Sequence, residues 1–235
     1  MITPRLQSIV NMASKSYITA DIGTDHAYVP IELVNKNIAE RAVASDVRPG
    51  PLEAARKNIE AAGLCGVIET RLGSGLEVLK NNEAEQIIIA GMGGELIESI
   101  LKGGAERFLT SRFILQPMNT QAELRRFLIS GGFTITGEDI AAEGFKVYNV
   151  ISVCFAKNAG DTRFFGAEAF AREIDYHLPP YLRDHELYGM LFAKKQREFE
   201  KIVSGLERSK FMTREDEEKL EHYRGMLNEL PSVRG

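Results

Sequence analysis

Short β-branched apolar runs alternate with helix-like segments through the first 155 residues of the chain. A run such as Gln86–Ala90 is apolar on both faces, as a strand between two layers of helices must be. This alternation predicts an α/β fold in which helices cover both faces of a parallel sheet. The predicted strands are Tyr17–Ile22, Ala42–Asp46, Val67–Leu72, Gln86–Ala90, Phe113–Gln116, Phe133–Ile135 and Val147–Phe155.

The connections between these runs predict how the strands are joined. Pro51–Ala62 and Thr120–Ser130 carry apolar residues at helical spacing, and the second is followed by the helix-ending pair Gly131-Gly132. The last two runs are separated by a polar stretch instead of a helix, so we expect an antiparallel hairpin at the sheet edge. The sequence therefore predicts a seven-stranded, mostly parallel sheet.

The pattern changes near residue 161, where the β-branched runs stop and long polar segments carry apolar residues at three and four spacing. Thr213 and Asp216 resemble a capping box at the start of the last helix. We expect a coiled-coil-like helical hairpin domain at residues 159–235, following a domain at residues 1–158, with the boundary inside Asn158–Thr162. The two expected apolar stripes are Leu187, Leu191, Phe199, Ile202, Val203 and Leu206, and Leu220, Tyr223, Leu227 and Leu230.

Composition narrows the class of protein. No run approaches the ~20 apolar residues of a membrane span, and the N-terminus lacks a secretory signal, so we expect a cytoplasmic protein without a membrane partner. Cys65 and Cys154 both lie in apolar segments; we predict two buried thiols, no disulfide and no metal site. The 29 Lys and Arg against 33 Asp and Glu give a net charge of −4, which does not indicate a polyanionic partner.

The segment Ala20–Ala27, ADIGTDHA, lies at the end of the first predicted strand and just before a helix. Gly23 allows a tight turn beside a ligand, and the amides at the start of the helix would face that ligand. Pro30 is suited to the first turn of that helix. An ordinary strand-to-helix turn would give the same local pattern, so the segment alone leaves both interpretations open.

Asp46 closes the second strand, 25 residues after Asp21. An acid there can accept both ribose hydroxyls of an adenosine-containing cofactor, or it can cap the next helix. Asp25 and His26 occupy positions that a dinucleotide fingerprint leaves bare for pyrophosphate. An acidic loop is instead compatible with a cationic ligand such as S-adenosylmethionine, which has a sulfonium and an ammonium.

Two further loops follow predicted strands at their carboxyl ends, where ligands bind in such sheets. Gly73-Ser74-Gly75 would allow close contact with a flat adenine. Ala90–Glu95 has three glycines in four residues, whereas one is enough for a tight turn. We therefore expect a ligand to approach the backbone there.

On these segments the chain resembles class I S-adenosylmethionine-dependent methyltransferases and, among them, the TrmK-type bacterial tRNA (adenine-N1)-methyltransferases, which modify adenine 22 of certain tRNAs. The resemblance extends over essentially the whole chain. It implies a Rossmann-like fold, S-adenosylmethionine as cofactor and tRNA as substrate, without a metal or an obligate protein partner. The segments that carry it are Ala20–Pro30, Ala44–Asp46, Arg71–Leu76, Ile88–Gly94 and Gln116-Pro117, although Asn119 stands one position later than the asparagine expected directly after the proline.

The resemblance also implies roles for particular residues. The cofactor would be bound by Asp21, Gly23, Thr24, Asp25, His26, Asp46, Val47, Gly73, Ser74, Gly75, Ala90, Gly91, Met92 and Gly93. The catalytic candidates are Asp25, His26 and Tyr28, and the substrate-binding candidates are Gln116, Pro117, Asn119, Lys194, Lys195 and Arg197.

Adenine N1 has a free lone pair, so the enzyme must mainly position the reactants and accommodate a cationic product. Asp25 would do so by accepting a hydrogen bond from the exocyclic amine of the adenine. Alternatively, Asp25 contacts only the cofactor or caps the following helix, and His26 makes a purely structural hydrogen bond.

Other functions also remain open at this point. Residues 161–235 contain 13 basic and 15 acidic residues, and the run from Lys194 to Arg197 is typical of a solvated helix face. A nicotinamide-dependent oxidoreductase would account for the alternating architecture and for Asp46, but not for Asp25 and His26. A non-catalytic module that binds the cofactor and another protein would account for the helical hairpin.

Overall fold

The structure, a computed structural model, describes residues 2–156, 167–209 and 211–233. The chain divides into two compact units, Met1–Gly166 and Ala167–Gly235. The predicted boundary at residues 158–162 lies outside the described residues. Within the described ranges, no helix is long and apolar enough to cross a membrane.

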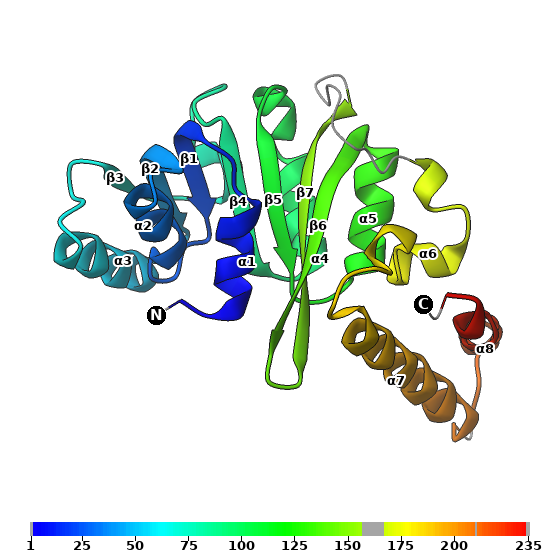
Figure 1. The fold of residues 1–235 in the computed structure, drawn as a ribbon. Helices are drawn as coiled ribbons and strands as arrows, with labels where there is room; N and C mark the ends of the chain where they lie inside the picture. The colour runs from blue at the N-terminus through cyan, green and yellow to red at the C-terminus, as the bar shows by residue number, and fades with distance from the viewer. Residues whose placement is uncertain (1, 157–166, 210, 234–235) are drawn as a thin grey trace. The chain divides into compact units, whose positions relative to one another are not determined.

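The first unit contains a seven-stranded sheet in the order β3-β2-β1-β4-β5-β7-β6 (Figure 1). The first five strands pair in parallel, and β7 pairs antiparallel with both β5 and β6. All seven predicted strands and the antiparallel edge hairpin are thereby confirmed. The strands are β1 (Ser16–Ile22), β2 (Ala39–Asp46), β3 (Ile68–Leu72), β4 (Gln86–Met92), β5 (Arg112–Pro117), β6 (Phe133–Glu143) and β7 (Lys146–Phe155).

Strand β6 is much longer than the predicted Phe133–Ile135, because the polar stretch after Ile135 belongs to the strand. Its polar side chains have partners. Glu138 pairs with the buried Arg125, and the Asp139 carboxylate accepts a hydrogen bond from the Ser8 hydroxyl at 2.5 Å. The polar residues after Ile135 therefore indicated a loop. In the structure they belong to a strand, and their side chains bond to other parts of the fold.

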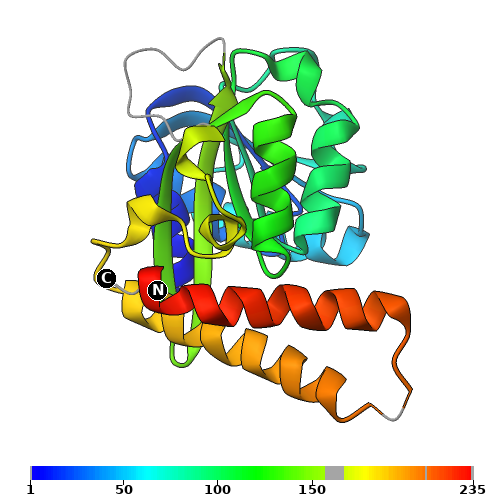
Figure 2. The same cartoon turned by 90° about the vertical axis from the view of Figure 1, so that its right-hand side faces the viewer.

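Helices cover both faces of the sheet. In the register of the parallel strands, Ala44, Asp21 and Ile88 lie in one row, and this face packs against α1, α2 and α3. Helices α4 and α5 lie on the other face (Figure 2). The bounds are α1 (Pro4–Met12), α2 (Tyr28–Asn35), α3 (Pro49–Ala61), α4 (Gly94–Lys102) and α5 (Gln121–Ser130), with short 3-10 helices η1 (Gly75–Val78) and η2 (Ala105–Phe108).

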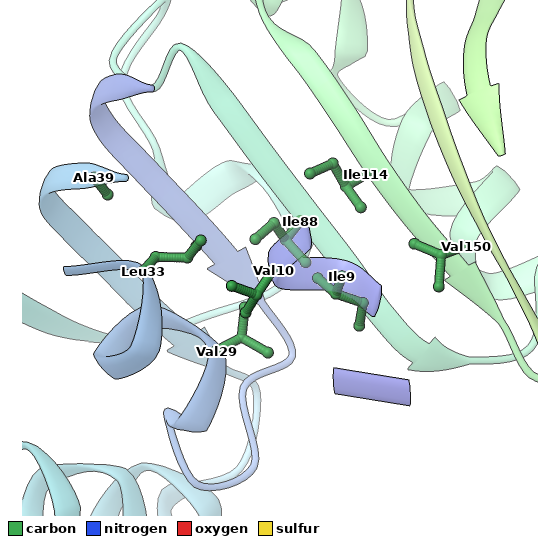
Figure 3. Close-up of a cluster of buried hydrophobic side chains, with 8 residues drawn as sticks. All are labelled: Ile9, Val10, Val29, Leu33, Ala39, Ile88, Ile114 and Val150. Carbon is green, nitrogen blue, oxygen red and sulfur yellow. The ribbon is translucent and has the colours of Figure 1, made fainter. Parts of the chain in front are cut away.

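Helix α1 was not among the predicted elements. It begins with Thr3, whose side chain accepts from the Leu6 amide at 3.5 Å, and with Pro4 in its first turn. Its apolar residues Ile9 and Val10 are buried in a cluster with residues from α2, β2, β4, β5 and β7 (Figure 3). Packing against the sheet, rather than a long apolar stripe, stabilises this short helix.

The second unit is helical, with α6 (Glu173–His177), α7 (Tyr188–Glu207), α8 (Arg214–Val233) and short 3-10 helices η4 (Ala167–Ala169) and η5 (Pro180–Leu182). Helices α7 and α8 form the predicted hairpin (Figure 2). The predicted capping box is confirmed, since the Thr213 amide donates to Asp216 Oδ2 at 2.9 Å and the Asp216 amide donates to Thr213 Oγ1 at 3.2 Å. The buried residues of α8 are Leu220, Met226, Leu230 and Val233.

The two cysteines differ in exposure. Cys154 is buried in β7, as predicted, whereas Cys65 is exposed. The prediction for Cys65 is wrong because its apolar neighbours form the surface turn between α3 and β3, where Gly63 has a φ of +71°.

Candidate functional site

A cavity of about 760 Å³ lies at the carboxyl ends of the parallel strands. Strand β1 has β2 on one side and β4 on the other, so the chain order reverses at β1. Such a switch point leaves a crevice between the loops that diverge from it. The predicted residues that line the cavity are Asp21, Gly23, Thr24, Asp25, His26, Tyr28, Asp46, Val47, Gly73, Ser74, Gly75, Ala90, Gly91 and Met92.

The loop after β1 is held by backbone bonds to β2. The Gly23 and Thr24 amides both donate to the Ser45 carbonyl at 2.7 Å, and Gly23 has a φ of +80°. Ala27 also adopts a left-handed conformation, and its amide donates to Thr24 Oγ1 at 3.2 Å. The loop is therefore fixed before any ligand binds.

Three side chains of this loop form a polar and aromatic wall. His26 Nε2 lies 3.3 Å from Asp25 Oδ2, and the His26 ring stacks on Tyr28 with centroids 5.3 Å apart. The Asp25 side chain is 71% exposed, which leaves it accessible to a ligand. The structure brings the three predicted catalytic residues together at the cavity, and their catalytic roles stay predictions.

Asp21 lines the cavity and is 7% exposed. Burial raises the pKa of its carboxyl to about 6, opposed by a hydrogen bond with Thr24 and reinforced by the nearby Asp46. Desolvation disfavours the charged form, so a cationic group placed beside Asp21 would restore its ionisation.

Asp46 lines the cavity and also makes a contact close to the start of α3. Its Oδ1 accepts from the Arg48 amide at 2.8 Å, which is a local contact just before α3. Arg48 Nε also lies 3.6 Å from Oδ1. Among the described residues, Asp46 Oδ2 has no hydrogen-bond partner, so one oxygen of this buried carboxylate is available to a ligand.

The glycines of the loops after β3 and β4 differ in their surroundings and backbone conformation. A Cβ on Gly73 would come within 2.6 Å of Val78 Cγ1, so packing by itself favours glycine there. Gly91 has a φ of +76° and lines the cavity. Gly93 lies outside the lining, and a Cβ there would meet the Asn119 amide oxygen at 3.0 Å.

The substrate-binding candidates are dispersed. Gln116 is buried, and its Oε1 accepts from the Gly91 amide at 3.1 Å and from Arg5 Nη1 at 2.8 Å. Pro117 is also buried, whereas Asn119 is exposed and accepts from the Gly94 amide at 3.2 Å. These three residues lie beside the cavity rather than in its lining.

Three further candidates lie on α7. Lys195 is buried and its Nζ lies 2.8 Å from Glu198 Oε2, while Lys194 Nζ lies 4.0 Å from the same carboxylate. Burial, with the neighbouring Lys195, lowers the pKa of Lys194. Arg197 is exposed. An RNA contact by these residues stays a prediction, and Arg197 is the most accessible of them.

The N-terminal segment contributes to the cavity, although no motif in the sequence predicted it. Ile2, Thr3, Arg5 and Leu6 all line it. Arg5 reaches Gln116 across 111 positions of sequence, and no local motif marks such a contact. The Thr3-Pro4 pair, typical of a helix start, is the signal that could have revealed this helix.

The chain has clear relatives among known proteins. A model of the methyltransferase domain family matches residues 2–151. The tRNA (adenine(22)-N(1))-methyltransferase of Bacillus subtilis is 38% identical over 151 residues, a match that covers 64% of this chain and 63% of the Bacillus enzyme. The solved structure of B. subtilis TrmK matches with a TM-score of 0.85 and 28% identity, covering 100% of this chain and 99% of that chain.

A Streptococcus pneumoniae structure solved with S-adenosyl-L-methionine has a TM-score of 0.82, 32% identity and complete coverage of both chains. The chain belongs to the TrmK family of methyltransferases. The resemblance read from the glycine and aspartate motifs is confirmed, and so is the Rossmann-like methyltransferase fold. TrmK membership supports a methyltransferase over the oxidoreductase and the non-catalytic module. Among the described residues, no group of three or more His, Cys, Asp or Glu is arranged to hold a metal ion.

Proposed function

We propose that this chain transfers a methyl group from S-adenosylmethionine to N1 of an adenine in tRNA, with adenine 22 as the target. The observation that carries the proposal is the cavity at the β1 switch point, whose acidic residues stand where the family motifs occur. The match to TrmK along the whole chain supports the same activity. Acting on tRNA, the protein would work in the cytoplasm and need no obligate protein partner.

The cavity suits S-adenosylmethionine in size and in chemistry. Its volume of about 760 Å³ lies within the range of ~300–1,000 Å³ typical of small-molecule sites. A buried Asp21 with a raised pKa favours a cationic ligand, and the available oxygen of Asp46 favours a hydrogen-bond donor. The apolar side chains of Leu96 and Ile100 also line the cavity and suit a flat ring.

Each acidic residue would bind a different part of the cofactor. Asp46 would accept hydrogen bonds from the ribose hydroxyls, and Asp21 would pair with the ammonium of the methionine part. The bound cofactor supplies an electrophilic methyl group on its sulfonium. The fixed loops would hold that methyl group toward the wall formed by Asp25, His26 and Tyr28.

The acceptor needs positioning rather than activation, because adenine N1 has a free lone pair at neutral pH. Asp25 would accept a hydrogen bond from the exocyclic amine and stabilise the positive charge that develops on the ring. The stacked pair of His26 and Tyr28 offers an aromatic surface to the base. Since N1 lies on the Watson–Crick edge, the adenine would leave its stack to enter the site.

The remaining candidates would act around this centre. Gln116, with Pro117, would hold the Gly91 turn in place through its bond to the Gly91 amide, and Gly93 and Asn119 would set the start of α4. Arg197, with Lys194 and Lys195 nearby on α7, would contact the tRNA backbone.

The test is transfer of a labelled methyl group. Purified protein is incubated with methyl-labelled S-adenosylmethionine and an unmodified tRNA transcript, and the product is digested to nucleosides. We expect label in 1-methyladenosine, and none when guanine replaces adenine 22. Label in another nucleoside, or equal label in both transcripts, would contradict the proposed target.

A further inference from the structure

The tip of the β6–β7 hairpin presents an aromatic side chain to solvent. Glu143 pairs with Lys146, so Gly144 and Phe145 form a two-residue turn at the tip that extends beyond the sheet (Figure 1). Gly144 has a φ of +59°, which fits a tight hairpin turn. Phe145 is 99% exposed. A short, hydrogen-bonded turn thus holds an apolar ring where packing within the fold gives it no role.

This tip lies at the same edge of the sheet as the cavity. Strand β7 is antiparallel to both β5 and β6, so β6 runs in the direction of the parallel strands and ends at their carboxyl edge. The Arg5 amide donates to Glu143 Oε1 at 3.1 Å, two residues before Phe145. Because Arg5 also lines the cavity, one residue connects the cavity wall to the hairpin.

Near the tip lie one acid, Glu143, and two cations, Lys146 and Arg5, and these cations favour an anionic partner. Lys146 is exposed, and among the described residues its side chain has no ion pair or hydrogen bond. The Arg5 guanidinium lies 5.6 Å from the centre of the Tyr148 ring and 2.8 Å from Gln116 Oε1, with no carboxylate within ion-pair distance among the described residues. An exposed ring beside a cation is the combination that binds single-stranded nucleic acid, through base stacking and phosphate contact.

We propose that the β6–β7 tip is a second RNA-binding element of the enzyme: Phe145 stacks on an unpaired base near the adenine that enters the cavity, and Lys146 contacts a neighbouring phosphate. The inference rests on the proposed tRNA methylation and specifies which surface meets the RNA. Extruding one base exposes the face of its neighbour, and an aromatic side chain at the entrance would cover that face. Phe145 is thus a positioning residue that does not touch the reacting atoms.

The chain offers a matched control. Tyr17 is also an exposed aromatic residue, 53% accessible, but it lies at the start of β1, on the opposite edge of the sheet. Truncation of Tyr17 removes a similar surface without affecting the cavity side. A difference in tRNA kinetics between F145A and Y17A therefore reflects where the aromatic ring lies. It does not reflect the loss of apolar surface, which the two variants share.

The first experiment compares wild type, F145A and Y17A in steady-state methylation of tRNA, together with calorimetric binding of S-adenosylhomocysteine. Stacking on one base is worth ~1–3 kcal/mol, so we expect KM for tRNA to rise about tenfold in F145A with kcat and cofactor affinity unchanged. Y17A should match wild type. Equal kinetics for F145A and wild type would overturn the inference while leaving the proposed function intact.

The second experiment does not depend on catalysis. The chain has no tryptophan, so F145W introduces a single fluorescent reporter at the tip. We expect F145W to retain wild-type KM, and its fluorescence to be quenched when unmodified tRNA is added. If tRNA at concentrations that saturate methylation leaves the tryptophan fluorescence unquenched, the inference is overturned. The same holds if no methylation occurs and added tRNA does not quench the fluorescence. Quenching without methylation would support the surface and contradict only the proposed reaction.

Discussion

The charged side chains at the carboxyl edge of the sheet and those in the helical unit have different surroundings. At the edge, the Asp46 Oδ2 oxygen and the exposed Asp25 carboxylate face a cavity, and burial raises the pKa of Asp21. In the helical unit, several cations are paired with acids of the same helix, as Lys195 is with Glu198 and Arg214 is with Glu218.

This difference explains why net charge is a poor guide to the function of this chain. A count of basic and acidic residues weighs internally neutralised pairs as heavily as groups that face a ligand. Surface pairs contribute little to stability, about 0–1 kcal/mol, and much of the helical unit's charge is of this kind. We infer that ligand binding depends instead on the few acids that line the cavity at the sheet edge.

The largest effect is expected on the free energy of unfolding, when the buried ion pair between Arg125 and Glu138 is broken. Arg125 and Glu138 are 1% and 0% exposed in their side chains, so R125M would leave a buried carboxylate without its cation. We expect a loss of about 3–5 kcal/mol in the free energy of unfolding, measured by urea denaturation. R126M, at a partly exposed neighbour 3.8 Å from Glu123, should cost less than about 0.5 kcal/mol. Equal losses in the two variants would contradict the distinction.

Loss of the Asp46 carboxylate should have the next largest effect. D46A removes the acceptor for two ribose hydroxyls, each bond to a charged group being worth about 1.5–3 kcal/mol, so S-adenosylhomocysteine should bind at least about a hundredfold more weakly by calorimetry. E77A, at an exposed acid of η1 outside the cavity lining, should leave that affinity unchanged. Retained affinity in D46A would limit Asp46 to its local contact with Arg48.

The D25A substitution distinguishes a role of Asp25 in turnover from a role in cofactor binding. If it accepts from the adenine amine, D25A should lower kcat for tRNA methylation about ten- to a hundredfold, because the developing charge loses its partner. Affinity for S-adenosylhomocysteine should stay within about twofold of wild type. A matching loss of affinity would instead place Asp25 on the cofactor.

Asp21 should make cofactor binding depend on pH. Its pKa in the free protein is raised to about 6, and the ionised form is the one that attracts a cation. Affinity for S-adenosylhomocysteine should therefore increase about tenfold between pH 5 and pH 7, as the carboxyl loses its proton. The same raised pKa means that the unliganded protein gains stability as pH falls through about 6. D21N should bind more weakly and show a flat profile, whereas a pH-dependent D21N would exclude Asp21 as the titrating group.

The smallest effect is expected on α7. Arg197 is exposed, so R197A should weaken tRNA binding about two- to threefold at low salt and reduce the dependence of log affinity on log salt by about one. K57A, at an exposed cation of α3, serves as the control. An unchanged salt dependence in R197A would remove α7 from the RNA-binding surface.

The sequence predicted the sheet because fully apolar runs such as Ile87–Ala90 have few alternatives in an α/β chain. It also predicted most of the cavity lining, since the carboxyl ends of parallel strands converge. It failed for β6, where Glu138 and Asp139 have partners that are distant in sequence. Arg5 was missed for the same reason, because its place in the site depends on packing of α1 against the sheet.

The central claim is that the acids lining the cavity at the β1 switch point hold the cofactor. A crystal structure of the chain with S-adenosylhomocysteine tests it most directly. The account predicts the ribose hydroxyls within hydrogen-bond distance of Asp46, the amino group beside Asp21 and the sulfur facing Asp25 and Tyr28. A ligand bound elsewhere, or one whose ribose does not contact Asp46, would contradict the account.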